Sequence, residues 1–322
     1  MKTRIVVAFG LALAAVATQA AEVFPARAVN LIVPNPPGGM NDITARPLAA
    51  VMQAIVKQPV VVQNKPGATG AVGTAFVASH KSDGHHILVT TPNLYLVVEK
   101  NKLLGDPQPY ALDQIVPLAL MSADPLIMVV ESHSPYKTVK DLAAAVKSSG
   151  AMAYASSGPY GILHVPIEMF LHAVGAKMRH VPTTGGGPAL LQLLGSHVQM
   201  SAGGPAAVHP HIGSGKLRPL ASWGAKRIAA MQDVPTLQEL GYPAEAYLWV
   251  GLFTPAGVPD AAMSALREAV GKAARDPQFT EAMQKVNSTI DYRDAPEFRK
   301  FFDQDHARLA AAVKRIGKVD AK

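Results

Sequence analysis

Four short glycine-rich loops carry the residues of this chain that could do chemistry. They lie at residues 37–42, 67–70, 156–158 and 183–187, each where a predicted strand hands over to a predicted helix. Glycine lets main-chain N–H groups point at a ligand, and the N-terminus of a helix favours negative charge. A single loop of this kind is equally explained by the tight turns that glycine permits. Four together favour a site for an anion.

We predict that the ligand contacts lie in these loops and at the positions next to them. The candidates are Pro37, Gly38, Gly39, Asn41, Asp42, Ala68, Thr69, Thr90, Ser156, Ser157, Gly158, Tyr160, His164, Thr183, Thr184, Gly185 and Gly186. Within this set we expect Tyr160 to line the site. His164 is a candidate because it follows the loop at residues 156–158 closely.

The first loop poses a question about where its helix begins. Pro47 would interrupt a helix capped at Asn41, but it fits the first turn of a helix capped at Thr44. This favours a later start. We therefore expect Asn41 and Asp42 to belong to the loop, with side chains free for a ligand.

Motifs of catalysis and of cofactor binding are missing. The chain has no Gly-x-Ser-x-Gly elbow, no Walker lysine loop and no His-Glu-x-x-His. Gly67, Gly70 and Gly73 are spaced like parts of a dinucleotide fingerprint, but the Gly-x-Gly pair is lacking. We predict no cofactor and no catalytic residue. An enzyme that uses Asp42 and His164 as an acid–base pair is the alternative, and it needs the two side chains within hydrogen-bond reach.

The histidines do not match a metal site. Among 11 of them, none is spaced with carboxylates as a known ligand set would be. Surface or capping roles explain them better, so no metal is predicted.

Composition narrows the class of protein. The 322 residues are 49% apolar and 16% charged, with a formal charge of +7 and no cysteine. The basic residues are scattered rather than gathered in a stripe, which argues against a nucleic-acid partner. The length suggests about two domains. The absence of cysteine excludes disulfides, thiol nucleophiles and thiolate metal sites.

Residues 1–20 have the pattern of a secretory signal peptide. Lys2 and Arg4 precede an apolar run at residues 5–16, and Thr18 and Ala20 are the small residues before a cut. Cleavage removes two basic residues and lowers the formal charge from +7 to +5. No later stretch reaches the roughly 20 apolar residues of a membrane span. A bacterial periplasm fits such a chain.

Strands and helices alternate along the chain in the manner of an α/β protein. Strands are predicted at residues 29–33, 60–62, 87–90 and 126–130. In the C-terminal third Asp260, Asp276 and Asp294 are predicted to start helices, because side-chain acceptors favour that position. Phe298, Phe302, Leu309, Val313 and Ile316 share one face of the last helix, which should pack on a core.

Several sequence blocks, taken in order, resemble one family. They are Phe24-Pro25, residues 33–42, residues 64–70, Asp83-Gly84, residues 156–158, His164, residues 185–190, residues 215–218, residues 233–236, Glu239-x-Gly241 and residues 249–257. Any single block is weak, whereas the ordered set is specific. It resembles the Bug-type receptors, which are the periplasmic solute-binding proteins of tripartite tricarboxylate transporters.

The resemblance implies a two-lobed periplasmic binding protein of type II-like α/β fold. Each lobe would be a mixed sheet flanked by helices, with a ligand cleft between the lobes. The domains would then be residues 21–124 with about 250–322, and about 125–249. A small carboxylate would be held partly through waters by the first loop, and by direct hydrogen bonds from Ser156, Ser157 and residues 183–187.

One departure from the family pattern concerns the ligand. The family commonly has Tyr-Lys before the glycine at position 185, where this chain has Thr183 and Thr184. We expect a less charged or differently shaped acid. The mechanism would be closure of a monomer about crossing strands near residues 126–130 and 247–253, followed by docking on integral-membrane transporter subunits. A sensor adaptor with the same cleft is the other alternative.

Overall fold

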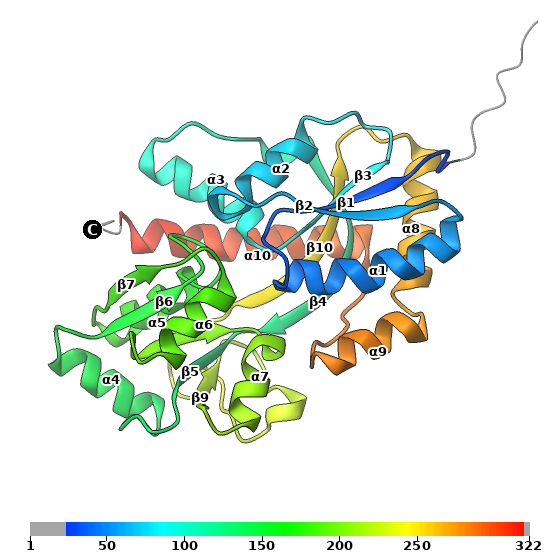
Figure 1. Ribbon diagram of the computed structural model, residues 1–322. Helices are drawn as coiled ribbons and strands as arrows, with labels where there is room; N and C mark the ends of the chain where they lie inside the picture. Colours follow the sequence, from blue (N-terminus) through cyan, green and yellow to red (C-terminus); the bar gives the residue numbers. More distant parts are fainter. Residues whose placement is uncertain (1–23, 319–322) are drawn as a thin grey trace, which may run out of the picture.

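The computed structural model describes residues 24–318, and the predicted signal peptide at residues 1–20 lies outside them. The described chain folds into two lobes, each built on one mixed sheet with helices packed against it (Figure 1). The α/β class and the two-lobed architecture expected from the sequence are confirmed.

The first lobe is built on a six-stranded sheet. Its strand order is β11-β4-β10-β3-β1-β2. The strands are β1 Val29–Val33, β2 Val60–Asn64, β3 His86–Thr90, β4 Ile115–Pro125, β10 Tyr247–Pro255 and β11 Arg293–Asp294. The helices are α1 Met40–Val56, α2 Ala71–Ala78, α3 Asn93–Leu104, α8 Asp260–Ala273, α9 Pro277–Lys285 and α10 Ala295–Ile316, with a 3-10 turn η1 at Ala68–Gly70. Because β1, β2 and β3 are parallel neighbours, their carboxyl ends meet at one edge.

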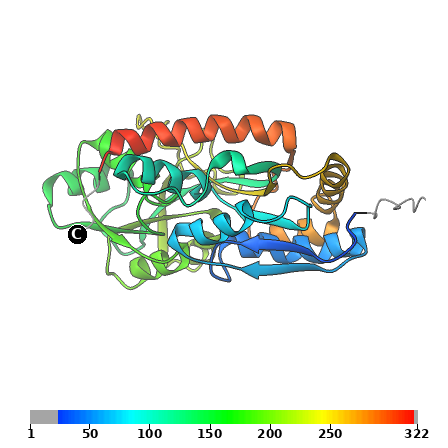
Figure 2. The ribbon, with the colours of Figure 1, turned by 90° about the horizontal axis from the view of Figure 1, so that it is seen from above.

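Side chains of the first sheet alternate between two core regions, as a period of two requires. Leu31 and Val89 pack toward α1, α8 and α9, while Ile32 and Leu88 point into the core that α2, α3 and α10 complete. Seen from above, α10 runs along one long side of the molecule and β1 and β2 lie toward the other (Figure 2). Burial on both faces explains why these short strands are almost wholly apolar.

The second lobe is built on a five-stranded sheet of order β7-β6-β8-β5-β9. The strands are β5 Ile127–Glu131, β6 Ala153–Ser156, β7 Arg179–Pro182, β8 Met200–Gly203 and β9 Leu217–Ser222. The helices are α4 Val139–Ser148, α5 Val165–Val174, α6 Gly186–Leu194 and α7 Pro205–Gly213. Strands β6, β7 and β8 are parallel where they pair, and β5 is antiparallel to β8 and β9. The carboxyl ends of β6 and β7 therefore lie side by side.

The main chain crosses between the sheets at two neighbouring places. One crossing runs from β4 into β5 between Pro125 and Ile127, and the other leads into β10 at Tyr247. Leu126 and Ala246 join the two crossings by a main-chain hydrogen bond of 3.4 Å. The strands of the two sheets thus divide close to the predicted domain boundaries at 124/125 and 249/250, which stay a proposal.

Local signals explain most helix starts. Thr138 and Asp141 form the expected capping box of α4, and Asp276 and Asp294 cap α9 and α10 through side-chain oxygens. Helix α8 differs by one residue, since Pro259 is the cap and Asp260 is the first helical residue. In α10 the predicted apolar face is buried: Phe298, Phe302, Leu309 and Val313 are in the core and Ile316 packs against it.

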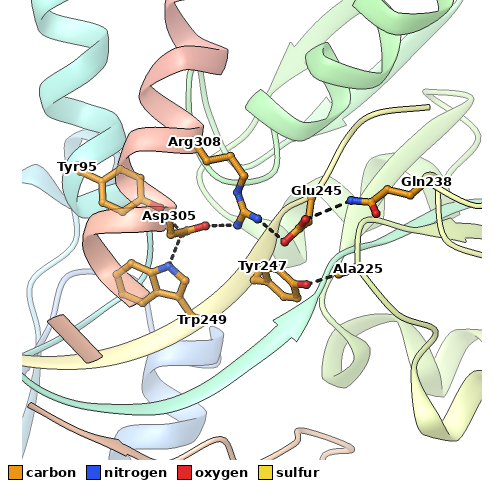
Figure 3. A network of polar contacts seen from close by, with 8 residues as sticks. All are labelled: Tyr95, Ala225, Gln238, Glu245, Tyr247, Trp249, Asp305 and Arg308. Atoms are coloured by element: carbon orange, nitrogen blue, oxygen red, sulfur yellow. Dashed lines mark hydrogen bonds and ion pairs between the residues drawn. The ribbon is translucent and has the colours of Figure 1, made fainter. Parts of the chain in front are cut away.

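A buried carboxylate ties α10 to the strand that crosses between the lobes. Asp305 accepts hydrogen bonds from Tyr95 of α3 and, at 2.7 Å, from the indole Nε1 of Trp249 in β10 (Figure 3). Arg308 pairs with Asp305 and with Glu245, which lies in the segment leading into β10. Ion pairs between side chains therefore stabilise the crossing together with main-chain hydrogen bonds.

Candidate functional site

The predicted loops from the two lobes face each other. A Cβ built on Gly158 would lie 3.3 Å from Thr69 Oγ1, so the β6–α5 loop of one lobe reaches η1 of the other. Close by, the main-chain N–H of Ile162 donates to Asn93 Oδ1 at 2.9 Å, and both residues are buried. The glycine loops at residues 67–70 and 156–158 thus meet at the boundary between the lobes.

Helix α1 begins earlier than the sequence suggested. It starts at Met40 with Gly39 as its N-cap, and Pro47 lies inside it. Thr44 does not cap the helix; its hydroxyl donates to the carbonyl of Met40 at 2.9 Å. The expectation that Asn41 and Asp42 belong to the loop is wrong. Helix α1 runs through Pro47 although this residue has no N–H to donate to the preceding turn.

The carboxylate of Asp42 already accepts hydrogen bonds from other residues of the protein. Its carboxylate accepts two hydrogen bonds from Arg46, both at 2.8 Å, and one each at 3.0 Å from Asn64 Nδ2 and from the main-chain N–H of Gly38. Burial raises the pKa of Asp42, but these hydrogen bonds outweigh it and hold the pKa below its ordinary value. Asp42 therefore shapes the Gly38 loop, and the predicted free side chain is corrected.

Two buried side-chain oxygens at the loops have no hydrogen-bond partner among the described residues. One is Asn41 Oδ1, whose amide Nδ2 donates to Asn35 at 2.6 Å, and the other is Ser157 Oγ. Leaving a buried polar group unpaired costs about 1–3 kcal/mol. One atom belongs to each lobe. They are the strongest candidates for contact with a polar ligand or its waters.

The other hydroxyls of the second lobe hold its loops together. Ser156 Oγ lies 2.7 Å from Nε2 of His180, and Thr183 Oγ1 lies within 2.9 Å of the carbonyl oxygens of Ser156 and Gly185. Thr184 is exposed. Helix α6 begins at Gly186, and the first N–H groups of a helix have no partner within it. Those N–H groups and the exposed Thr184 hydroxyl, rather than the Thr183 hydroxyl, are the donors available here.

Several predicted residues lie near the loops without an open polar group of their own. Pro37 and Ala68 are exposed apolar residues, and Thr90 is buried at the end of β3. The hydroxyl of Tyr160 donates to the carbonyl of Gly317 at 3.0 Å, which directs this side chain to the C-terminal segment.

The acid–base pair required by the enzyme alternative is not assembled. The partners of Asp42 are Arg46, Asn64 and Gly38, whereas the Nδ1 of His164 accepts from the N–H of Tyr160. Among residues 24–318 no group of three or more histidine, aspartate or glutamate side chains could hold a metal ion.

Sequence reasoning missed four residues that shape the site: Arg46, Asn64, Asn93 and His180. Arg46 had a usable signal, because it stands four residues after Asp42 on one helix. Asn93 and His180 act through partners far away in the sequence, so no local pattern marks them.

A hollow of about 620 Å³ lies away from these loops, between α5, α10 and the segment before β10. Met169, Tyr242, Glu245, Arg308 and Arg315 are among its lining residues. The hollow adjoins the ion pairs of Arg308 with Asp305 and Glu245 rather than the glycine loops.

Two α/β lobes that are joined by paired crossing strands, with helix N-termini gathered where the lobes meet, define a solute-binding protein. Residues 44–318 match the tripartite tricarboxylate transporter family receptor, and the chain belongs to this family. Within residues 24–318, no helix combines the length and the apolar character that a membrane span requires.

The sequence and the structure are similar to those of known proteins over nearly the whole chain. Protein BugT of Bordetella pertussis is 32% identical, with 98% of each chain covered. The structure of the periplasmic binding protein BugD is 29% identical, with a TM-score of 0.81 over 91% of this chain and 99% of that one.

Two solved structures of this fold contain a carboxylate. MatC of Rhodopseudomonas palustris with bound malate has 25% identity and a TM-score of 0.82, covering 90% of this chain and 99% of that one. A second R. palustris protein, with adipate, has 25% identity and a TM-score of 0.83, covering 91% and 98%.

Proposed function

We propose that this protein captures a small dicarboxylate between its lobes in the periplasm and presents it to integral-membrane transporter subunits. Membership of a transporter receptor family supports the second part. The ligands of the two R. palustris proteins, malate and adipate, support the first, since each carries two carboxylates.

The observation that carries the proposal is the pair of unpartnered buried atoms, one on each lobe. Ser157 Oγ can donate to a carboxylate oxygen, and Asn41 Oδ1 can accept from a ligand hydroxyl or from a bridging water. A bridging water is nearly as favourable as a direct bond and lets one loop accept different acids. The N-termini of α1 and α6 favour the negative charge.

The free energy of binding that such a receptor requires is modest. A micromolar dissociation constant corresponds to about −8 kcal/mol. Hydrogen bonds to a charged group contribute about 1.5–3 kcal/mol each, so a few of them supply much of this. An acid that contacts both lobes shifts the balance toward the closed state, because it makes both sets of contacts only there.

Ligand specificity is tested by calorimetric titration with acetate, malate, adipate and citrate. We expect the dicarboxylates to bind and acetate to bind at least tenfold more weakly, because one carboxylate cannot engage both lobes. The absence of a lysine at Thr184 predicts weak citrate binding. A clear preference for citrate would contradict the proposed ligand class, and no binding of any of these acids would contradict the proposed function.

The Ser157 hydroxyl provides a sharper test. Ser157→Ala removes the donor on the second lobe, and we expect dicarboxylate affinity to fall by roughly 10-fold to 100-fold, since such a bond contributes about 1.5–3 kcal/mol. Ser148→Ala is the matched control, because Ser148 is exposed at the end of α4 and bonds only to its own helix. Equal affinities for the two variants would remove Ser157 from the site.

Location and partner need separate measurements. We expect the full chain, expressed in a bacterium, to appear in the periplasmic fraction without residues 1–20, and to migrate as a monomer. Ligand-loaded protein should be retained by membranes that contain its transporter subunits and not by membranes that lack them. Retention instead by a signalling receptor would favour the sensor-adaptor alternative.

A further inference from the structure

His164 lies beneath the β6–α5 loop and is fully buried. Its Nδ1 is 2.9 Å from the main-chain nitrogen of Tyr160, which carries a hydrogen. An N–H can only donate, so Nδ1 must be the unprotonated, accepting nitrogen and the ring hydrogen must be on Nε2. The hydrogen bond therefore specifies one neutral tautomer of this histidine.

The main chain of the loop that contains Gly158 and Tyr160 has an uncommon conformation. Tyr160 has a φ of 55° and Gly158 a φ of 119°, both in the left-handed range that side chains disfavour. The turn continues through bonds from the N–H groups of Gly161 and His164 to the carbonyls of Gly158 and Gly161. Such a conformation persists only where surrounding contacts hold it.

A second histidine holds the other end of the same loop. The ring of His180 is 4.2 Å from that of His164, centre to centre, and its Nε2 is 2.7 Å from Ser156 Oγ. Ser157, whose hydroxyl is buried without a partner, lies between Ser156 and Tyr160. The two neighbouring rings, tilted by 32°, thus bond to residues on both sides of Ser157.

The remaining groups around the ring keep it neutral. Tyr154 stacks at 6.0 Å, and Glu168 Oε1 is 4.0 Å from Nε2, too far for a hydrogen bond. Burial, together with the neighbouring His180, lowers the pKa of His164 to about 3, and burial lowers that of His180 to about 4. Both rings are therefore neutral at pH 7, and His164 keeps an unprotonated Nδ1 that can accept.

We propose that His164 is a positioning residue of the ligand site. By accepting the N–H of Tyr160, it holds the strained loop so that Ser157 and Gly158 meet the other lobe. The inference rests on the proposed function. It differs from a role in packing alone, because a packing ring needs bulk and shape, whereas a positioning ring needs an acceptor at Nδ1.

Two substitutions separate these roles. In His164→Asn the amide oxygen can take the place of Nδ1, and we expect dicarboxylate affinity within about threefold of the wild type. His164→Leu keeps apolar bulk without an acceptor, and we expect affinity at least tenfold lower, mainly through faster release. Thermal melting checks that both variants are folded. Full affinity in His164→Leu, or equal losses in both variants, would overturn the proposal.

A spectroscopic measurement on the wild type covers the case in which a variant does not fold. Nitrogen-15 spectra of the histidine rings should show an unprotonated Nδ1 and a protonated Nε2 for His164. A protonated Nδ1 would overturn the proposal.

Failure of the proposed function can be told apart from failure of the positioning role of His164. If the wild type binds none of the acids, the proposed function fails. Hydrogen exchange of the Tyr160 amide then decides whether His164 holds the loop: it should be slow in the wild type and His164→Asn and faster in His164→Leu. Equal exchange in all three proteins would refute the positioning role.

Discussion

Asp42 shows how a charged residue beside a binding loop can serve the loop rather than the ligand. Its side chain is 5% exposed and meets Arg46, Asn64 and the N–H of Gly38. Arg46 is largely exposed, so the ion pair itself adds little stability. The bond to Gly38 constrains the path of the first loop, which belongs to the proposed ligand site.

Replacing Asp42 should affect stability and binding together. In Asp42→Ala the N–H of Gly38 and the amide of Asn64 lose their acceptor, and we expect the free energy of unfolding to fall by about 1–3 kcal/mol. Dicarboxylate affinity should fall as well, because the loop is released. Urea denaturation and calorimetry measure the two effects. Asp113→Ala, at an exposed site, is the control, and a variant that matches it in both assays would refute this role.

The two buried histidines predict how stability depends on pH. Each has a folded pKa, about 3 for His164 and about 4 for His180, below the ordinary value of 6.5. Between pH 6.5 and 4 these two residues therefore bind more protons in the unfolded chain, and their contribution to stability falls as the pH falls. Each group contributes up to about 1.4 kcal/mol per pH unit in this range.

The contribution of His164 is isolated by comparison with His164→Asn, which cannot titrate. We expect urea denaturation at pH 7, 6, 5 and 4.5 to show a steeper loss for the wild type than for the variant. Parallel profiles would mean that the folded protein protonates His164 as readily as the unfolded chain does.

At the scale of elements, α10 is attached to the crossing strand by one carboxylate with several partners. Asp305 is 2% exposed and meets Tyr95 of α3, Trp249 of β10 and Arg308 of its own helix. Burial and the adjacent Asp305 raise the pKa of Tyr95 well above its usual range, so its phenol stays a donor. The carboxylate thus joins three elements where the lobes connect.

Removing that carboxylate should be strongly destabilising. In Asp305→Ala the phenol and the indole N–H lose their acceptor and Arg308 keeps only Glu245, so we expect a loss of about 3–5 kcal/mol. Asp305→Asn keeps one acceptor oxygen, which can serve the phenol and the indole, and should lose less. Asp303→Ala, on the exposed face of α10, should change stability by less than about 0.5 kcal/mol. Similar melting temperatures for Asp305→Ala and Asp303→Ala would contradict the assigned role.

At the scale of the whole molecule, the two lobes are joined by the crossing strands and touch again at the glycine loops. The buried bond from Ile162 N–H to Asn93 Oδ1 links the lobes on the ligand side. The contact between Asn287 and His209, at 3.3 Å, is a second link and is exposed. Periplasmic binding proteins close by hinge motion, and buried links of this kind favour the closed state.

Breaking the buried link should favour opening. Asn93→Ala leaves the N–H of Ile162 buried and unpaired only when the lobes are closed, and we expect dicarboxylate affinity to fall by roughly tenfold, mainly through faster release. Asn287→Gly, which keeps the left-handed backbone at φ 53° unstrained, should stay within twofold of the wild type. Small-angle scattering of the ligand-free proteins should show Asn93→Ala as the more extended. Wild-type affinity in Asn93→Ala would exclude the link from closure.

The sequence by itself determined the elements and their class, because those signals are carried by neighbouring residues. The capping pair of Thr138 and Asp141 and the caps at Asp276 and Asp294 were all read correctly, since a cap involves residues within one turn. The alternation of strands, glycine loops and helices likewise indicated two α/β lobes.

Only the tertiary structure decided which polar groups are engaged. Asp42 was expected to be free, although the i, i+4 spacing of Arg46 was a usable signal; its bond from Asn64, 22 residues away, could not be foreseen. The link between Asn93 and Ile162 spans 69 residues, and that between Trp249 and Asp305 spans 56. Such pairs depend on how the sheets and helices pack, and a hydrogen bond needs its two atoms placed within a few tenths of an ångström.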